Sequence, residues 1–385
     1  MEDKIVKTIT VFVPGSMCNL RCHYCYVSQC LDESHLEKPS YDYPLETMIK
    51  AFSKKRLGGL AEITVISNGE TLMDDTIIPF IHGLLKEGHV VTLVTNLTLN
   101  NKIDQLLDFP QEYLKRLIVK GSLHWLELKR TNKVDDYFNN MKKVLSKGAS
   151  SYPFLVLSED YMKYVDEILE ICKEKIGTTP HCTPNFTFDE KTDLKRGGAI
   201  KTSPECTKEF VDYVDKNFDS RIFDACVKYI DIDPKKTFCY AGDWSFNVSL
   251  KDGAMKKCHG CKPEANFYEN LDKLPKLSPI GTNCQIASCA LQYNFVAQGL
   301  LPDAPQVDTY GKMIAKPGII NDEVVNLLDF RYTDDHRQLS KKEQEKINKK
   351  VNEFYELSDH RYKYKIMYKI WKYLDSKLKR KGIIR

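Results

Sequence analysis

From residue 8 to about residue 190, strand-like and helix-like segments alternate, and this alternation restricts the fold more than any other feature. Apolar, β-branched runs are separated by stretches whose apolar residues recur at helical spacing. The strand-like runs are Thr8–Val13, Glu62–Ile66, Val90–Val94, Leu117–Val119, Phe154–Leu157 and Asn185–Phe188. Six strand–helix pairs predict a parallel sheet with right-handed crossovers, in which the loops after the strands share one edge.

Two of the intervening stretches show the helical period clearly. In residues 44–57, apolar side chains recur every three or four positions, and Gly58-Gly59 ends the run. In residues 159–175 the same spacing recurs from Tyr161 to Cys172. We therefore expect one helix in each stretch.

Three cysteines lie shortly after the first strand-like run. Cys18, Cys22 and Cys25, in the segment SMCNLRCHYCY, have a Cys-x3-Cys-x2-Cys spacing. Closely spaced thiolates suit zinc or an iron–sulfur cluster. A closed four-iron cluster takes four cysteines, so three ligands would leave one iron open to a small molecule. The spacing favours an iron–sulfur cluster over structural zinc, with Cys30 as the alternative fourth ligand.

This segment resembles the signature of the radical SAM superfamily, in which an aromatic residue precedes the last cysteine. Cys18, Cys22, Tyr24 and Cys25 match that signature without a gap. The resemblance implies a partial (β/α)6 TIM-like barrel and a [4Fe-4S] cluster whose open iron binds S-adenosylmethionine. In that family one electron from the cluster cleaves the sulfonium, and a 5′-deoxyadenosyl radical then removes a hydrogen atom from the substrate. An electron donor such as flavodoxin or ferredoxin is the implied protein partner.

A second match follows the run Glu62–Ile66. The segment Ser67-Asn68-Gly69-Glu70 stands where the family has Gly-Gly-Glu, and Glu70 would accept a hydrogen bond from the S-adenosylmethionine ammonium. Asn68 replaces the first glycine, and Thr71 stands where a proline often follows. Asparagine tolerates left-handed backbone better than most residues, so we expect this departure to be mild.

Weaker correspondences lie after the next two strands. Ser122 stands where the family often places a hydroxyl against the S-adenosylmethionine ribose. Thr95 and Asn96 end a strand at the rim where the cofactor and substrate would lie. His124 and Glu127 are candidate catalytic groups, for acid–base chemistry or hydrogen bonding to substrate. Their alternative interpretation is that of polar residues at the start of a helix.

A second group of cysteines lies nearer the C-terminus: Cys239, Cys258, Cys261, Cys284 and Cys289. Together with Gly253, their spacing resembles the auxiliary-cluster extension of many radical SAM enzymes. The larger SPASM form holds two clusters, and the smaller twitch form holds one, for which five cysteines suffice. The Asp252-Gly253 turn predicts a hairpin whose return strand leads to Cys258. We expect four of the five to bind a second [4Fe-4S] cluster, with Cys261 able to replace another, and with a zinc knuckle as the alternative.

These features suggest four segments. Residues 1–190 would form the barrel core, 191–236 a helical connection, 237–310 a small cysteine-rich α+β extension, and 311–385 a helical segment. Residues 361–385 hold ten Lys or Arg against one acidic residue. A helix docked on the barrel with a solvated basic face explains this better than a membrane surface or nucleic acid.

Composition excludes several classes of protein. The 385 residues carry a formal net charge of only +4, which requires no polyanionic partner such as nucleic acid. No run approaches the ~18 apolar residues of a membrane span. The N-terminus shows no signal-peptide pattern, so the 13 cysteines indicate a reducing cytoplasm rather than a disulfide framework.

The sequence therefore predicts a radical SAM enzyme that takes a hydrogen atom from a small polar, for example sugar-like, substrate. An auxiliary cluster would assist a net oxidation. The motif begins at residue 18, which leaves no room for a fused leader-binding domain. A peptide or protein maturase with a separate leader-binding partner is the alternative. A non-enzymatic iron–sulfur electron carrier or a zinc-stabilised binding module is the alternative of another class.

Overall fold

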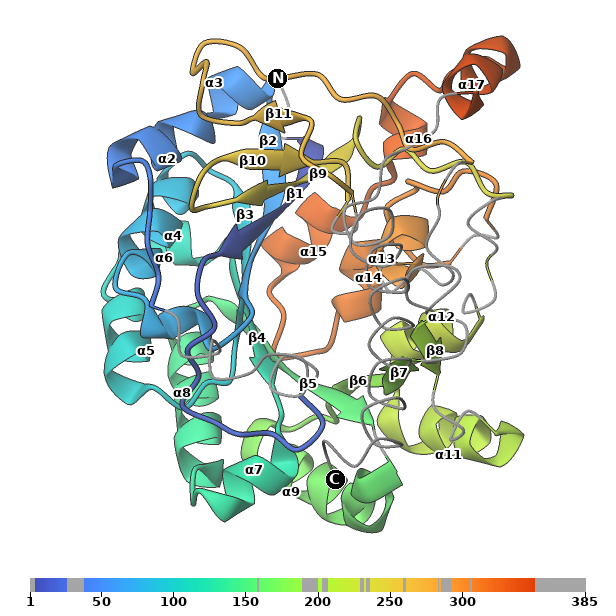
Figure 1. Cartoon of the computed structure of the whole chain (residues 1–385). Helices are drawn as coiled ribbons and strands as arrows, with labels where there is room; N and C mark the ends of the chain where they lie inside the picture. Colours follow the sequence, from blue (N-terminus) through green and yellow to red (C-terminus); the bar gives the residue numbers. More distant parts are fainter. Residues whose placement is uncertain are drawn as a thin grey trace, which may run out of the picture.

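The computed structural model describes residues 4–25, 38–157, 159–188, 200–202, 207–228, 232, 236–258, 261–282, 284, 292–304 and 307–349. A nine-stranded sheet lies at its centre, with the strand order β11-β10-β9-β1-β2-β3-β4-β5-β6 (Figure 1). Six strands are parallel neighbours in chain order: β1 (Ile5–Val13), β2 (Leu60–Ser67), β3 (Val90–Thr95), β4 (Leu117–Ser122), β5 (Ser150–Leu157) and β6 (His181–Pro184). They form the partial (β/α)6 barrel that the alternating pattern predicts.

Helices connect these strands on the outer face of the sheet (Figure 1). They are α2 (Leu45–Ala51), α3 (Lys54–Leu57), α4 (Ile77–Lys86), α5 (Asn100–Leu107), α6 (Gln111–Leu114), α7 (Trp125–Arg130), α8 (Val134–Ser146) and α9 (Val165–Ile176), with 3-10 turns η2 (Thr71–Met73) and η3 (Glu159–Tyr164). Alternate strand residues such as Val11, Ile63 and Val119 pack with these helices in one apolar core. Successive side chains of a strand point to opposite faces, so the residues between them face inward.

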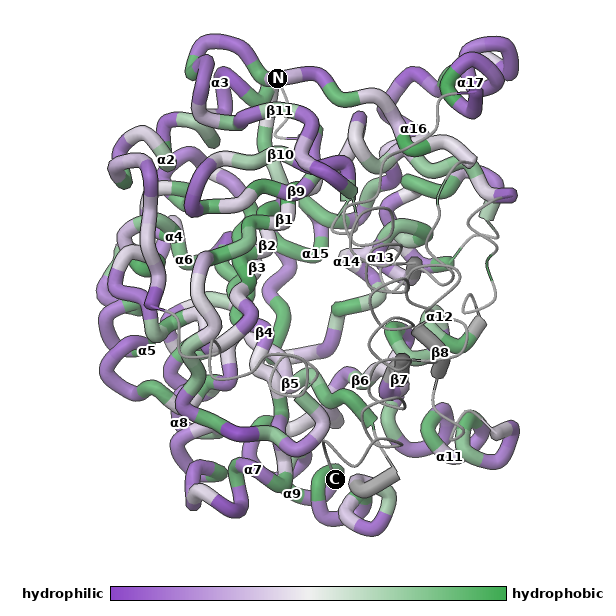
Figure 2. The backbone as a smooth tube through the Cα atoms, viewed as in Figure 1, coloured by the Kyte–Doolittle hydropathy of each residue, from purple (hydrophilic) through white to green (hydrophobic). Residues whose placement is uncertain are grey.

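On the inner face, the part of the sheet near the amino ends of the strands is covered by the C-terminal half of the chain. Strand residues such as Leu60, Ile118 and Tyr152 share a second apolar core with side chains from residues 222–332. The elements of that half are α11 (Lys208–Phe218), α12 (Arg221–Lys228), α13 (Gln292–Ala297), α14 (Tyr310–Ile314), α15 (Asp322–Leu328), α16 (Tyr332–Asp335) and α17 (Lys341–Asn348). Figure 2 shows apolar strands at the centre and a mostly hydrophilic α17 at the periphery.

The expected last strand, Asn185–Phe188, is wrong as a barrel strand. The sixth strand is β6, which is buried throughout and pairs with β5. The later segment β7 (Phe186–Phe188) pairs antiparallel with β8 (Ile200–Thr202) in a separate sheet. The sequence His-Cys-Thr-Pro of β6 lacks the β-branched apolar run on which strand prediction depends, whereas tertiary burial favours it here.

Other expected elements form with altered bounds. The helix expected over 44–57 divides into α2 and α3, and Gly58 ends α3 in the left-handed conformation. The helix expected over 159–175 begins with the turn η3 before α9. The predicted hairpin is confirmed: β9 (Ser245–Ser249) and β10 (Ala254–Lys256) are antiparallel across the turn at Gly253.

The hairpin does not stand apart from the barrel. β9 pairs in parallel with β1, and β10 continues the same sheet to β11 (Ala265–Asn266). The four-segment division of the chain remains a prediction, and the basic segment 361–385 lies outside the described residues. Over the described part of the chain, no helix has the length and apolar character needed to cross a bilayer.

His181 in β6 makes the stability of the fold depend on pH. Its Nε2 lies 3.1 Å from Ile314 O, and burial, with the Lys316 charge next, lowers the pKa of the imidazole to about 3. An unfolded histidine has a pKa of about 6.5, so below that pH the unfolded chain binds the proton first. As the pH falls from about 6.5 toward 3, this residue should lower the free energy of unfolding by about 1.4 kcal/mol for each pH unit.

Denaturant unfolding at pH 7, 6 and 5 measures this dependence. The slope of stability against pH below 6.5 should be shallower in His181→Gln than in the unaltered protein by about that amount. Parallel slopes for the two proteins would contradict a neutral, buried His181.

Candidate active site

The three N-terminal cysteines lie on the loop that follows β1, and all three are half-buried. Leu20 N lies 3.5 Å from Cys18 Sγ, and Cys25 N donates to Cys22 O at 3.1 Å, which closes a turn. Burial raises the pKa of the Cys18 thiol to about 11, and the charges of Glu70 and Cys25 add to this effect. Burial also raises the pKa of Cys22, as do the charges of Cys18 and Glu127. The thiols therefore lie close enough together to act on one another.

Gly69 lets this loop lie directly against the end of β2. A Cβ atom at position 69 would lie 2.0 Å from Met17 O and 2.6 Å from Ser16 C, both backbone atoms. Glu70 N donates to the same Met17 O at 2.8 Å. A glycine is required here by close backbone approach rather than by a positive φ.

Ser67 and Asn68 complete this turn in different ways. Ser67 Oγ accepts from Gly69 N at 3.1 Å and lies 3.3 Å from Gly15 O, so it also ties the turn to the cysteine loop. Asn68 is exposed, and it is not among the described non-glycine residues with positive φ. The replacement of the family's first glycine thus needs no left-handed backbone.

Glu70 is a buried carboxylate held by three hydrogen bonds. Its Oε1 accepts from Thr95 Oγ1 at 2.6 Å and from Leu72 N at 3.0 Å, and its Oε2 accepts from Asn96 N at 2.7 Å. Desolvation raises the pKa of this carboxyl, and the three hydrogen bonds oppose the rise. The group is fixed in orientation beside Cys18 and joins the ends of β2 and β3.

Asn96 extends the network from β3 to the cysteine loop. Its Nδ2 donates to Asn19 Oδ1 at 2.8 Å, and Asn19 Nδ2 donates to Thr98 Oγ1 at 2.8 Å. Thr98 in turn donates to Asn96 Oδ1 at 2.7 Å. Leu97, between them, is buried with φ of 56°, an uncommon conformation for a bulky residue that tends to occur at functional sites.

Tyr24 and His124 contact each other across the barrel edge. Tyr24 Oη and His124 Nδ1 are 2.5 Å apart, and Tyr161 lies against Tyr24 with ring centroids 5.8 Å apart. Burial lowers the pKa of His124 to about 4, against an opposing effect of Glu127. This pKa makes the imidazole neutral at pH 7, and its Nδ1 shares a hydrogen bond with the Tyr24 hydroxyl.

Glu127 is engaged by two groups. Its Oε1 accepts from Arg21 N in the cysteine loop at 2.6 Å, and Arg130 binds both carboxylate oxygens at 2.7 Å. Hydrogen bonding to Arg130 lowers the pKa of Glu127, so the group is ionised. These contacts anchor the loop, whereas an acid–base role for Glu127 remains a prediction. Ser122 lies half-buried at the end of β4, directly before this segment.

The donor set of the loop fits an iron–sulfur cluster. Three thiols on one short segment beside a fixed carboxylate provide three ligands and leave a fourth position open. Among the described residues, no three His, Cys, Asp or Glu side chains converge on a single-ion site. The ligands of a cluster surround a cube rather than one ion, so this arrangement is compatible with a cluster. Cys30, the rival ligand, lies outside the described residues.

The C-terminal cysteines also lie near one another. Cys239 and Gly281 exchange backbone hydrogen bonds at 3.2 and 3.0 Å, and Cys284 follows three residues later. Cys258 and Cys261 share a turn, with Cys261 N donating to Cys258 O at 3.0 Å. Burial raises the pKa of Cys261, and the charges of Cys258 and Cys284 contribute. None of the described cysteines forms a disulfide, and Cys289 lies outside the described residues.

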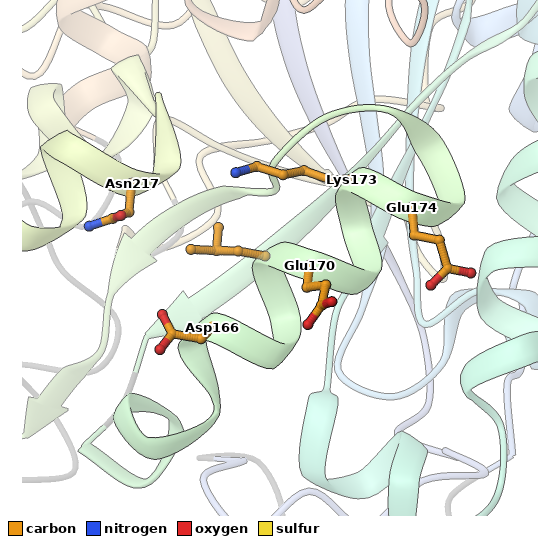
Figure 3. A pocket seen from close by; sticks show the side chains of 6 residues that line it. Asp166, Glu170, Lys173, Glu174 and Asn217 are labelled. Atoms are coloured by element: carbon orange, nitrogen blue, oxygen red, sulfur yellow. The ribbon is translucent and has the colours of Figure 1, made fainter.

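A pocket of about 500 Å³ lies elsewhere, between α9 and α11 (Figure 3). It is lined by Leu169 and by polar side chains that include Asp166, Lys173 and Asn217. The other apolar residues of α9 belong to the core on the outer face of the sheet, so this pocket is on the opposite side of the sheet from the inner face. Its charged residues are exposed, and it contributes nothing to the cysteine site.

Sequence reasoning missed several residues of this site. Asn19, Thr98 and Arg21 hold the loop through hydrogen bonds between segments about 80 to 110 residues apart in the chain. No local pattern marks such partners, although an Asn-x-Thr pair after a buried strand is a recognisable turn signal.

A parallel α/β barrel with a three-cysteine loop and a buried carboxylate at its carboxyl edge has the features expected of a barrel protein that binds a metal cluster. Residues 12–172 match the family model described as the radical SAM superfamily. This part of the chain is therefore a radical SAM domain. Its family uses a [4Fe-4S] cluster and S-adenosylmethionine.

Several solved structures are distantly similar to this chain. SuiB of Streptococcus suis, bound to S-adenosylmethionine, has 16% identity over 70% of this chain and 63% of its own, with a TM-score of 0.46. Polyhistidine-tagged anSMEcpe with bound AdoMet has 16% identity over 96% and 95%, with a TM-score of 0.44. BtrN, in complex with AdoMet and 2-DOIA, has 12% identity over 70% and 84%, with a TM-score of 0.32.

The chain spans only 63–65% of the length of the SuiB chains. No curated protein sequence matches it significantly. Similarities this distant assign no substrate to the chain.

Replacing Gly69 tests the contact between the cysteine loop and β2. The methyl group introduced by Gly69→Ala would overlap the backbone of Met17, so the loop must shift and its thiols with it. We expect anaerobically purified Gly69→Ala to contain up to about four fewer irons per chain than the unaltered protein, with a matching loss of sulfide.

Gly177→Ala is the matched control, because nothing lies within 4 Å of a Cβ there and only its positive φ adds strain. It should lower thermal stability slightly and keep its iron. Equal iron content in both variants would show that the loop contact does not support cluster binding.

Proposed function

We propose that Cys18, Cys22 and Cys25 bind a [4Fe-4S] cluster and that Glu70 orients S-adenosylmethionine on its open iron. The observation that carries this proposal is the position of Glu70. A buried, ionisable carboxylate is fixed by Thr95 and Asn96 and acts on the pKa of Cys18. A charged ammonium on the ligand would compensate the cost of burying that carboxylate.

The bound cofactors would supply one-electron cleavage of a sulfonium and a radical that abstracts hydrogen. The chain's own residues bind, orient and exclude water. The network of Asn96, Asn19 and Thr98 keeps the loop in register with β3. Tyr24, which is held by His124, closes the loop on the side of α7. Ser122, at the end of β4, is the residue proposed to meet the ribose.

We further propose that the substrate is a small polar molecule bound at the inner face of the sheet. Between the apolar core and the carboxyl ends of the strands, this face carries half-buried polar side chains, among them Thr10, Thr64 and Ser122. Such residues fix the orientation of polar groups rather than bury apolar surface. A peptide substrate delivered by a partner is the competing class and forms one arm of the test.

We also propose an auxiliary cluster on the C-terminal cysteines. The support is the grouping of Cys258, Cys261 and Cys284 with the strand-paired Cys239. An auxiliary cluster could accept an electron from substrate and so complete a net oxidation. About eight irons per chain would support two clusters, and about four would support the first alone.

The direct test is anaerobic incubation with dithionite and S-adenosylmethionine. We expect 5′-deoxyadenosine, formed faster in the presence of substrate, with small polar metabolites and peptides supplied as separate arms. No 5′-deoxyadenosine in any arm would reject the proposed chemistry. Stimulation by peptides alone would reject the small-molecule class while keeping the enzyme.

Glu70→Gln tests the proposed carboxylate. The new amide NH2 would face groups that themselves donate, from Thr95, Leu72 and Asn96. It would also lose the charge proposed to bind an ammonium. We expect at least about tenfold weaker S-adenosylmethionine binding, read from the shift it causes in the EPR spectrum of the reduced cluster, with iron content kept.

Glu87→Gln is the matched control, since Glu87 also accepts a backbone N–H, from Lys54 at 2.9 Å, but far along the chain from the cysteines. It should leave the spectral shift unchanged. An unaltered shift in Glu70→Gln would remove Glu70 from the proposed site.

His124→Ala tests the residue beside Tyr24. We expect it to reduce substrate turnover more than S-adenosylmethionine cleavage, because His124 lies on the loop just after β4, toward the substrate. Tyr24→Phe removes the same hydrogen bond and keeps the imidazole. If both variants lose cleavage and turnover equally, His124 only positions Tyr24.

A further inference from the structure

Lys120 lies on the inner face of β4, at the boundary between the apolar core and the polar residues near the carboxyl edge of the sheet. It pairs with Tyr152 of β5, and Ser122, two residues on, pairs with Phe154. Ile118, two residues earlier, belongs to the apolar core that the inner face forms with the C-terminal half of the chain. Side chains two apart on a strand share a face, so Lys120 lies between that core and Ser122.

Among the described residues, no carboxylate forms an ion pair with the ammonium of Lys120, although the charge of Glu62 acts on it. Its Nζ lies 3.4 Å from the centroid of the Phe154 ring, a cation–π contact. Within the part of the chain that the structure describes, it forms no hydrogen bond and no ion pair. Desolvation lowers the pKa of Lys120 to about 8, with opposing effects from Cys226 and Glu62.

Glu62, the acidic residue whose charge acts on Lys120, is engaged elsewhere. Glu62 Oε1 accepts from Thr64 Oγ1 at 3.1 Å, and its Oε2 accepts from Gln298 Nε2 at 3.3 Å. Thr92, inward-facing on the neighbouring β3, has a buried hydroxyl without a hydrogen bond to any described residue. As far as the described chain extends, an unpaired ammonium and an unpaired hydroxyl therefore lie on adjacent strands of one face.

Lys120 is half-buried, and Lys316, which is buried, shows how this fold can satisfy a lysine. Lys316 Nζ donates to Thr179 O at 2.9 Å, to Thr179 Oγ1 at 2.8 Å and to Phe218 O at 3.2 Å. Removing a charge from water is costly, and the described residues give Lys316 three hydrogen bonds but give Lys120 only an aromatic ring and the distant charge of Glu62. The compensation for Lys120 is expected from a ligand.

We propose that Lys120 binds an anionic group, a carboxylate or a phosphate, of the substrate. The proposal rests on the proposed function, since it places the substrate on the inner face between Ser122 and the apolar core. It narrows the substrate class from small polar molecules to small anions. The carboxylate of S-adenosylmethionine is the other source of the same chemistry, and the experiment separates the two.

Equilibrium dialysis of the cluster-loaded enzyme tests the site with radiolabelled inorganic phosphate and acetate at constant ionic strength. We expect one of the two probes to bind at one equivalent per chain. Binding should weaken at least about tenfold in Lys120→Met, since a hydrogen bond to a charged group is lost. Lys120→Arg should retain it, and Lys120→Gln replaces Lys120→Met if the latter fails to fold.

Lys86→Met is the matched control. Lys86 also lies over an aromatic ring, with Nζ 5.7 Å from the Phe109 centroid, but on the exposed outer surface. The Lys86→Met substitution removes one positive charge, as Lys120→Met does, and should leave probe binding unchanged. Equal loss in both variants would mean that net charge alone governs binding, which would overturn the proposal.

Saturating S-adenosylmethionine separates the two sources. If the probe still binds, the site is distinct from the cofactor carboxylate, as proposed. If S-adenosylmethionine displaces the probe in a Lys120-dependent manner, Lys120 serves the cofactor and the proposal is wrong. No probe binding, or unchanged binding in Lys120→Met, also overturns it. The 5′-deoxyadenosine assay on the same samples reports the proposed function separately, because dialysis requires no turnover.

Discussion

The site depends on one close backbone contact, between the end of β2 and the loop after β1. Glu70 N donates to Met17 O, and Gly69 leaves room for that oxygen. The contact can form because β1 and β2 are parallel neighbours in register up to Val13 and Ser67, so both loops begin at the same edge. A three-cysteine segment and a carboxylate about 50 residues apart thereby become one site.

Burial then sets the electrostatic character of each group. Desolvation raises the pKa values of Cys18, Cys22 and Glu70 and lowers that of His124. All four shifts favour the neutral forms, although the three hydrogen bonds to Glu70 oppose the shift of that carboxyl. Binding a cationic cluster and a ligand ammonium would reverse this balance at the cysteines and Glu70 and stabilise their ionised forms.

Sequence patterns predicted the barrel and the main site segments because both depend on local features. A parallel strand buried by helices has an apolar run, and a thiolate cluster has a fixed spacing. The errors occurred where tertiary contacts decide. β6 is a strand because β5 and the surrounding core bury His181 to Pro184, and not because of its own propensity. The attachment of β9 to β1 joins segments more than 230 residues apart, which no local signal can specify.

The same limit explains why no local sequence pattern marks Lys120 as a candidate binding residue. A single lysine in the strand Leu-Ile-Val-Lys-Gly-Ser is consistent with a solvated inner or outer position. Its significance comes from the C-terminal half of the chain. The described residues of that half cover the inner face near the amino ends of the strands and supply Gln298 to Glu62, but none forms an ion pair with Lys120. A barrel filled only by its own strands would have needed an apolar residue there. The inner face is thus apolar near the amino ends of the strands and carries polar side chains toward the edge where the cysteines lie.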